Sequence, residues 1–375
     1  MKRPFAAAMR RANRLMRPAK LGKAAKSLQK MMTGMALAPL AALVPKAKVA
    51  RKAKVARKPK VGQTLGTVLQ QLRKVQGLTP EVAADDPPRL AAGAQYLTRT
   101  HRTAAGARGY KLYLPAHPPK GLIVMLHGCK QNPDDFARGT DMNRLAEKHD
   151  LAVAYPAQTT RHNPAACWNW FAPSNQRRSS GEPAILASLT RKLMQEFGLK
   201  REGVFVAGLS AGGAMAAILA DVYPDLFAAA GIHSGLARGA AHDVFSAMAA
   251  MRNGGAGAET LPDQGAHPPR RIIFQGDADS TVHPANAEML LTAAVGAGAE
   301  PVKTSKRSVN GRAYVRRDYG GAGDAALVQL WLLEGAGHAW SGGNKAGSYA
   351  DSTGPDASAL MMRFFLAEKG VGQGS

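Results

Sequence analysis

A serine set between two glycines is the residue of this chain best suited to do chemistry. The stretch Gly208-Leu209-Ser210-Ala211-Gly212 follows the apolar run Val204–Ala207 and leads into a helix-permissive run, Ala214–Ala220. In this strand, turn and helix context, Gly-x-Ser-x-Gly is typical of a nucleophile elbow. The tight turn strains the serine backbone, and side chains at the two glycine positions would collide with the neighbouring strand and helix. A glycine-rich loop with an incidental serine is the weaker interpretation.

A carboxylate that could support such a serine follows the apolar strand Arg271–Phe274. In a hydrolase triad of this chain order, the acid lies on a loop after a strand that comes later than the serine. Two candidates occur there, Asp277 and Asp279. The pattern Gly-x-x-Asp-x-x-Val favours Asp279 as the acid, and Asp277 then binds backbone N–H groups in the turn.

A histidine on a glycine-rich loop provides the candidate base. His338 follows the last expected strand, Leu327–Leu333, and precedes the last expected helix, Pro355–Glu368. The chain order Ser210, Asp279, His338 is the order of a serine hydrolase built on a parallel sheet. The sequence offers three rivals. We expect His127 to shape the oxyanion loop and His233 to be structural, while His283 lies in the acid loop itself.

Two backbone N–H groups could stabilise an oxyanion at the serine. The N–H of Ala211 opens the helix after the elbow, where backbone N–H groups point at a bound anion. The second donor is expected from the loop after the buried strand Gly121–Leu126, and we assign it to Cys129, with Gly128 allowing close approach. This chemistry needs no metal and no cofactor, and we predict neither.

The elements that would position these residues alternate between strands and helices, which predicts an α/β fold with a mostly parallel central sheet flanked by helices. Gln95–Leu114 is expected to form a hairpin, and Asn310-Gly311 marks a second one between Lys303–Ser308 and Ala313–Asp318. Further elements are expected at the following residues: helices Asp134–His149, Glu182–Phe197, Ala211–Tyr223 and Ala285–Val295, and strands Leu151–Tyr155 and Phe227–Ile232.

The positive charge is concentrated at the start of the 375-residue chain. Residues 1–75 hold 20 Lys and Arg and no acid, out of a net charge of +24, so the other 300 residues carry +4. We therefore divide the chain into a basic arm, 1–90, and a catalytic domain, 91–375. The arm contains a basic amphipathic region, Met1–Met32, and the repeat Lys46–Val61, which favours an extended or disordered linker.

The sequence of the arm indicates which partners and which cellular location to expect. The repeat has no aromatic residue to stack on bases, so we do not expect a nucleic-acid partner. No apolar run is long enough to span a bilayer. Met31–Val44 has some features of a signal peptide, but its basic lead is long and Pro39 interrupts it. Secretion is therefore the alternative location.

Three aromatic residues fall close together in Cys167-Trp168-Asn169-Trp170-Phe171, outside any strand pattern. Two interpretations stay open with equal weight: a loop that closes a small hydrophobic core, or the lining of an apolar substrate cleft.

The region from about Tyr110 to Phe365 resembles the catalytic domain of polyhydroxybutyrate depolymerases, which are grouped with feruloyl and acetylxylan esterases. The resemblance is carried by six blocks in the family's order: LHGCKQNPDDFARGTDMNRLAEKHDLAVAYPAQ, CWNWF, Gly181-Glu182-Pro183, AGLSAGGAM, QGDADSTVHPAN and EGAGHAWSGG. It implies an α/β-hydrolase fold and hydrolysis of short-side-chain poly(3-hydroxyalkanoates) by Ser210, Asp279 and His338. The same resemblance implies an oxyanion N–H from Cys129.

The resemblance also implies apolar contacts to the polymer from three aromatic residues: Trp168, Trp170 and Trp340. We see no C-terminal substrate-binding domain of the kind that secreted depolymerases add. The basic arm is similar to arms of intracellular members, which implies a cytoplasmic enzyme whose arm meets the surface of polymer granules. A disulfide between Cys129 and Cys167 would favour an oxidising compartment instead, and the sequence leaves it open.

Other functions remain as alternatives. A carboxylesterase for carbohydrate-linked esters, of the feruloyl or acetylxylan type, would use the same triad. A non-catalytic binder of granules or nucleic acid, built on the arm, would leave the triad without a role.

Overall fold

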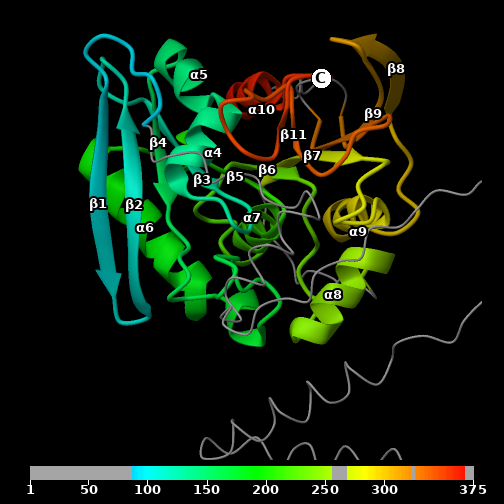
Figure 1. Ribbon diagram of the computed structural model, residues 1–375, viewed down its shortest axis with the longest axis horizontal. Helices are drawn as coiled ribbons and strands as arrows, with labels where there is room; N and C mark the ends of the chain where they lie inside the picture. The colour runs from blue at the N-terminus through cyan, green and yellow to red at the C-terminus, as the bar shows by residue number, and fades with distance from the viewer. Residues whose placement is uncertain (1–86, 256–267, 322–325, 368–375) are drawn as a thin grey trace, which may run out of the picture. The chain divides into compact units, whose positions relative to one another are not determined.

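The computed structural model describes residues 87–255, 268–321 and 326–367 (Figure 1). The amphipathic region, the Lys/Ala/Val repeat and the apolar run Met31–Val44 lie outside the described residues, so their predictions stay untested. Among the described residues, no helix has the length and apolar character needed to cross a membrane.

Ten strands of the described residues form one sheet, in the order β1-β2-β4-β3-β5-β6-β7-β10-β9-β8. The strands have these bounds: β1 (Gln95–Thr103), β2 (Gly106–Leu114), β3 (Gly121–Leu126), β4 (Leu151–Pro156), β5 (Val204–Leu209), β6 (Ala229–His233), β7 (Arg270–Gly276), β8 (Lys303–Val309), β9 (Arg312–Tyr319) and β10 (Val328–Leu333). Two short strands, β11 (Trp340–Ser341) and β12 (Ala350–Asp351), pair separately. The order confirms that strands distant in the chain are neighbours in one sheet.

The six middle strands, from β4 to β10, run parallel, while the pairs at both ends are antiparallel. The central strands β3, β4 and β5 are buried at every position. Their sequences are continuous apolar runs because helices cover both faces of a parallel sheet. The outer strand β8 has no fully buried position, and its sequence, KTSKRSV, is correspondingly polar.

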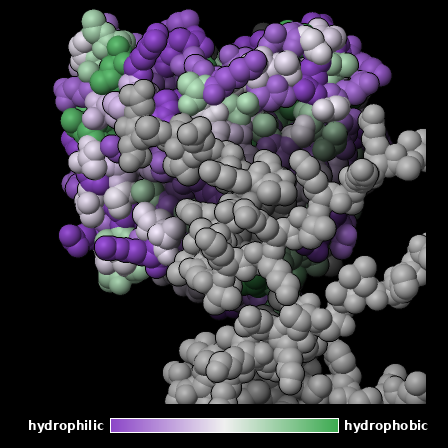
Figure 2. All heavy atoms as spheres, viewed as in Figure 1, coloured by the Kyte–Doolittle hydropathy of each residue, from purple (hydrophilic) through white to green (hydrophobic). Residues whose placement is uncertain are grey.

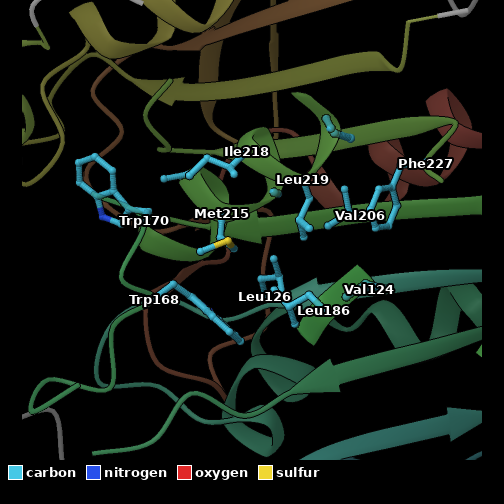
Figure 3. Packing of buried hydrophobic residues seen from close by; sticks show 14 of the residues in the cluster. Val124, Leu126, Trp168, Trp170, Leu186, Val206, Met215, Ile218, Leu219 and Phe227 are labelled. Atoms are coloured by element: carbon cyan, nitrogen blue, oxygen red, sulfur yellow. The ribbon is translucent and has the colours of Figure 1, made fainter. Parts of the chain in front are cut away.

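The helices that cover the sheet have these bounds: α4 (Pro133–Thr140), α5 (Met142–Lys148), α6 (Gly181–Phe197), α7 (Ala211–Val222), α8 (Val244–Asn253), α9 (Ala285–Val295) and α10 (Ala357–Leu366). Alternate residues of β3 face opposite cores, as the period of a strand requires. Ile123 and Met125 pack with α4, α5 and α10. Val124 and Leu126 pack with α6 and α7, and Figure 3 shows Leu126 near Met215 of α7 and Val124 near Leu186 of α6. The fold is therefore a three-layer α/β fold, with α10 and α5 on one side of the sheet and α6, α7 and α9 on the other (Figure 1).

The expected hairpins are confirmed, since β1 pairs with β2 and β8 with β9. In the second hairpin, Asn310 and Gly311 have φ values of 47° and 75°, as a two-residue turn of mirror-image type requires. The other expected strands and the helices Glu182–Phe197, Ala211–Tyr223 and Ala285–Val295 are also present, with ends shifted by a few residues.

One prediction of a helix was wrong, and one helix was missed. The single helix expected over Asp134–His149 is two helices, because Asp141 adopts a left-handed conformation with φ 52° and ends α4. Aspartate tolerates this conformation better than most residues, so the break needs no glycine. Helix α8 was not predicted at all. Its start does carry a local signal, since Asp243 and Ser246 cap each other's backbone N–H groups.

Candidate active site

The turn between β5 and α7 holds Ser210 in a strained backbone conformation, with φ 58° and ψ −121°. Such a conformation persists only where the surroundings enforce it. Here the Ser210 N–H donates to the carbonyl of His233 at 2.9 Å, which ties the turn to the next strand. The Ser210 side chain makes no capping bond to α7. The serine hydroxyl is thus held at the tip of the turn and is not used by the helix.

The two glycines around Ser210 are needed for contact between backbones. A Cβ on Gly212 would lie 2.0 Å from the carbonyl oxygen of Leu126, at the end of β3. A Cβ on Gly208 would lie 2.4 Å from the backbone of Gly212. No side chain fits at such distances, so the glycine spacing predicted from the sequence has a steric cause.

The loops that follow β3, β5, β7 and β10 all leave the same edge of the sheet, because these four strands run parallel. These loops carry the predicted residues Cys129, Ser210, Asp279 and His338. The carboxyl ends of neighbouring parallel strands are where ligands bind in open α/β sheets.

His338 and Asp279, the predicted base and acid, contact each other at this edge. The His338 Nδ1 and the Asp279 Oδ2 are 2.8 Å apart. Asp279 is 4% exposed, and its Oδ1 accepts the N–H groups of Thr281 and Val282 at 2.9 and 2.8 Å. Burial alone would raise the pKa of Asp279, but the His338 hydrogen bond and charge, with the two N–H groups, lower it below its ordinary value. An ionised Asp279 keeps the proton of neutral His338 on Nδ1 and leaves Nε2 as a proton acceptor.

The rival carboxylate Asp277 has a different environment. It is exposed, and its Oδ1 accepts the N–H of Gly335 at 2.6 Å. Its own N–H donates to the carbonyl of Leu333 at 3.1 Å. Asp277 therefore joins the loop after β7 to the loop that leads to His338, and it does not face the histidine ring.

The loop after β3 aims the N–H of Cys129. The carbonyl oxygen of Gly128 accepts from His127 Nδ1 at 2.8 Å and from the N–H of Gln131 at 3.3 Å. In a planar trans peptide the next N–H points opposite to this carbonyl, so fixing Gly128 O also fixes the Cys129 N–H. A Cβ on Gly128 would lie 3.6 Å from the Ser210 Cβ, so the loop lies against the serine.

Both predicted oxyanion donors are available. Ala211 is the first residue of α7, where an N–H has no partner within the helix. Across the described ranges, neither the Ala211 N–H nor the Cys129 N–H has a hydrogen-bond acceptor. Backbone donors left open beside a serine can serve as an oxyanion hole.

Two of the rival histidines have both ring nitrogens engaged in the core. His127 accepts the N–H of Gln158 at Nε2, 3.0 Å away, while its Nδ1 bonds Gly128 O. His233 accepts the N–H of Ser341 at Nε2, 3.1 Å away, and its ring stacks with Phe274 and Trp340. The third rival is exposed His283, whose Nδ1 accepts the N–H of Ala285. The positions of His127 and His233 fit the loop-shaping and structural roles expected for them.

Two of the buried histidines, His127 and His233, make stability sensitive to acid. Burial lowers the pKa of His127 to about 4. Burial, and to a smaller extent the nearby His338, lowers the pKa of His233 to about 3. An unfolded histidine has a pKa of about 6.5, so the unfolded chain binds more protons and stability falls as the pH drops below that value.

We expect the free energy of unfolding to fall by about 4 kcal/mol between pH 7 and pH 5, with about half from each histidine. Urea unfolding at a series of pH values measures this. His283→Gln, a change at an exposed ring, is the control and should leave the slope unaltered. A free energy of unfolding that stays constant over this range would contradict the prediction.

The expectation that Trp168 and Trp340 contact a substrate was wrong for the described structure. Trp168 is 0% exposed, and its Nε1 donates to the carbonyl of His127 at 3.1 Å. Trp340 is 1% exposed, and its Nε1 donates to Ser358 Oγ at 3.0 Å. Both rings fill the core, and both polar ends have partners.

Trp170 is also buried and lies edge-on to Phe171, with the ring centroids 5.8 Å apart. Figure 3 shows Trp168 and Trp170 on either side of Met215 of α7. Of the two open interpretations of the aromatic block, the structure supports the loop that closes a hydrophobic core.

Cys129 and Cys167 form a disulfide that links the loop after β3 to the aromatic block. The sequence had left this bond open. It fastens the residue that carries one predicted oxyanion donor to a segment 38 residues later in the chain.

Removing this disulfide is expected to destabilise the protein by about 4 kcal/mol, because a bond that closes a loop of this length restricts the unfolded chain. The double variant Cys129→Ser/Cys167→Ser should show this loss in urea unfolding. Dithiothreitol should shift the wild-type transition toward that of the variant and leave the variant itself unchanged. A variant as stable as the wild type would contradict the expectation.

A buried charge network beneath the site escaped the sequence analysis. Glu182 Oε1 accepts from Arg108 at 3.1 Å and from Gln158 Nε2 at 2.6 Å. Glu182 Oε2 accepts the N–H of Asn169 at 2.8 Å. The network thus anchors the aromatic block. One signal was available, because Arg108 falls on the inward face of β2 with Tyr110 and Leu112, and a buried charge there requires a partner.

The fold and site together define an α/β hydrolase, and comparison with known proteins places the chain more narrowly. A family model described as "Esterase PHB depolymerase" matches residues 108–297, just over half of the chain. The chain belongs to this esterase family.

Relatives with two kinds of name are similar to this chain. Poly(3-hydroxyalkanoate) depolymerase C of Paucimonas lemoignei is 28% identical over 238 residues, which are 60% of this chain and 56% of the relative. A probable acetylxylan esterase A of Aspergillus clavatus is 29% identical over 196 residues, which are 48% of this chain and 62% of the relative. The matches therefore span less than two thirds of either relative.

The solved structure of an acetyl xylan esterase from Aspergillus awamori is similar, with a TM-score of 0.52 and 22% identity. The likeness covers 65% of this chain and 93% of that chain. It supports the α/β-hydrolase fold.

Proposed function

We propose that this protein is a serine ester hydrolase that cleaves poly(3-hydroxybutyrate)-type polyesters through an acyl-enzyme. The observation that carries the proposal is the strained Ser210 between Gly208 and Gly212, at the sheet edge that also carries the Asp279–His338 pair. Membership of the esterase family supports the same reaction class.

In the proposed mechanism, His338 Nε2 takes the proton of the Ser210 hydroxyl as Oγ attacks the ester carbonyl. Asp279 holds the imidazole in the right tautomer and stabilises the imidazolium. The oxyanion accepts from the N–H groups of Ala211 and Cys129, and each such donor contributes about 3 kcal/mol. His338 returns the proton to the leaving alcohol. Water then attacks the acyl-enzyme with His338 again as base.

The surface near the acid loop supports a polyester substrate. Helix α8 exposes Phe245 and Met248, at 77% and 54%, while the coloured part of the face that Figure 2 shows is mostly hydrophilic. The end of α8 meets the acid loop, since the carbonyl of Met251 accepts the N–H of His283 at 2.7 Å. Exposed apolar side chains on a helix beside the site suit a water-insoluble polyester.

The alternative is a carboxylesterase of the feruloyl or acetylxylan type. The burial of Trp168 and Trp340 favours it, because the apolar polymer contacts expected from those rings are missing. The acetylxylan esterases among the relatives also support it.

Turnover of four substrates by the purified protein tests the proposal: emulsified amorphous poly(3-hydroxybutyrate), acetylated xylan, methyl ferulate and p-nitrophenyl butyrate. Clearing of the polymer that disappears in Ser210→Ala is the expected result. Release of acetate from xylan without polymer clearing would replace the polyester with the alternative substrate. No turnover of any ester would overturn the hydrolase itself.

The role of the arm and the location are further parts of the proposal. We keep the division into a basic arm, 1–90, and a catalytic domain, 91–375, and propose that the arm meets the anionic coat of polymer granules. The cytoplasm was the expected location. The Cys129–Cys167 disulfide supports the alternative, an oxidising compartment such as that of a secreted protein. Comparing granule binding by the full chain and by a chain lacking residues 1–86 tests the arm.

A further inference from the structure

The Gln131 side chain lies where two loops of the site meet. It follows the oxyanion loop and is buried. Its Oε1 accepts the N–H of Gly128 at 2.9 Å. Its own backbone N–H donates to the Gly128 carbonyl. Gln131 thus binds both the N–H and the carbonyl of Gly128, and the position of this carbonyl sets the direction of the Cys129 N–H.

The other end of the same amide reaches a segment more than 200 residues later. Gln131 Nε2 donates to the carbonyl of Ser348 at 3.0 Å and to Asp135 Oδ2 at 3.1 Å. Asp135 Oδ1 in turn accepts the N–H of Ser348 at 2.8 Å. The Gln131 amide therefore binds the carbonyl of Ser348, and the Asp135 carboxylate binds its N–H.

The residue after Ser348 faces the proposed base. Tyr349 has its ring edge-on to His338, with the centroids 6.4 Å apart and the planes at 80°. Its carbonyl accepts the N–H of Trp340 at 2.7 Å, two residues beyond the histidine. Tyr349 is a non-glycine residue with φ 50°, so its conformation must be maintained by its neighbours.

We propose that Gln131 is a positioning residue that holds the oxyanion loop and the His338 loop in a fixed position relative to each other. One amide holds the peptide that aims the Cys129 N–H and, through Ser348, the backbone that places Tyr349 against His338. The inference rests on the proposed function, because it assigns roles to the oxyanion donor and the base. A displacement of about 1 Å in such groups is enough to lower the rate strongly.

The test compares Gln131→Met, which keeps the length of the side chain and loses its hydrogen bonds, with Gln131→Glu, which keeps an acceptor for Gly128 and loses the donor. The matched control is Gln176→Met, because Gln176 is another buried glutamine that bridges backbone groups, those of Phe171, Gly239 and Ala241. Three quantities are measured: kcat and KM for p-nitrophenyl butyrate, inhibition by butylboronic acid, which forms a tetrahedral adduct on a serine, and backbone hydrogen exchange.

For Gln131→Met we expect kcat to fall about 10-fold or more with KM nearly unchanged, since oxyanion donors act in the transition state. Boronic acid affinity should fall by a similar factor. Hydrogen exchange should rise both at 127–131 and at 344–351. Gln131→Glu should recover part of the exchange protection at 127–131 but not at 344–351. Gln176→Met should lower thermal stability and leave kcat unaltered.

Two results would overturn the inference. One is an exchange increase in Gln131→Met that stops at the oxyanion loop and leaves 344–351 protected. The other, given an active wild type, is a Gln131→Met variant that keeps the kcat and the boronic acid affinity of the wild type. A wild type without esterase activity would instead count against the proposed function, and hydrogen exchange would still decide whether Gln131 couples the two loops.

Discussion

Ser210→Ala should lower kcat for p-nitrophenyl butyrate by about a million-fold, which is the scale seen when the nucleophile of a serine hydrolase is removed. The hydroxyl is the only part of the side chain that the change deletes, and it caps no helix. The backbone strain at φ 58° is the same for alanine as for serine. The thermal midpoint should therefore stay close to that of the wild type, so that loss of activity reports chemistry and not unfolding.

The control is Ser234→Ala, a change at a buried serine that also has a positive φ, 48°, and also follows a strand of the parallel sheet. It should retain activity within about 10-fold of the wild type, because it supplies no nucleophile in the proposed mechanism. Appreciable turnover by Ser210→Ala, or a loss in Ser234→Ala as large as in Ser210→Ala, would rule out Ser210 as the nucleophile.

Asp279→Asn should lower kcat by about ten-thousand-fold, because an amide cannot hold His338 in the tautomer that leaves Nε2 free to accept a proton. The measurement is kcat at a pH where the wild type is fully active. Asp279 also accepts two backbone N–H groups, so the variant will lose some stability, and its thermal midpoint must be measured alongside.

Asp277→Asn is the matched control, two residues away on the same loop. Its Oδ1 bonds Gly335 N–H at 2.6 Å, and an asparagine oxygen can accept the same bond. We expect a loss of less than about 10-fold. If Asp277→Asn lost the larger share of activity, the assignment of the acid would have to be reversed.

Two buried histidines and the carboxylate of Asp279 make the protein less stable in acid. The buried His127 and His233 are neutral in the fold, so protonating them favours unfolding below about pH 6.5. The lowered pKa of Asp279 contributes stability that is present above the unfolded pKa of about 3.9 and is lost as the pH falls through the folded value. Stability should therefore decline first through the histidines and later through the carboxylate.

The sequence located the elements that depend on local chemistry. The glycine spacing around Ser210 reflects a turn of five residues, and the clash distances at Gly208 and Gly212 explain it. The Asn310-Gly311 turn reflects two positive φ values. The continuous apolar runs of β3 and β5 reflect burial on both faces of a parallel sheet. Each of these features is set by residues near one another in the chain.

The break at Asp141 and the start of α8 were also local features, but their signals were weak. At the end of α4, an aspartate takes the left-handed position that glycine usually occupies. At the start of α8, Asp243 and Ser246 form the cap, in place of the more familiar Ser or Thr followed by Glu. A pattern that polar loops also show cannot by itself mark the end or the start of a helix.

The tertiary structure alone decided the contacts between residues far apart in the chain. The sequence ranked Asp279 above Asp277, but only the fold brings Asp279 within 2.8 Å of His338, 59 residues later. It placed Trp168 in the core beside His127, where the sequence had allowed a substrate cleft. Gln131 carried no signal at all, since its role depends on Ser348, 217 residues away. Local patterns determine turns and strands, whereas burial and long-range hydrogen bonds depend on how the layers pack, and packing is what assigns these side chains their roles.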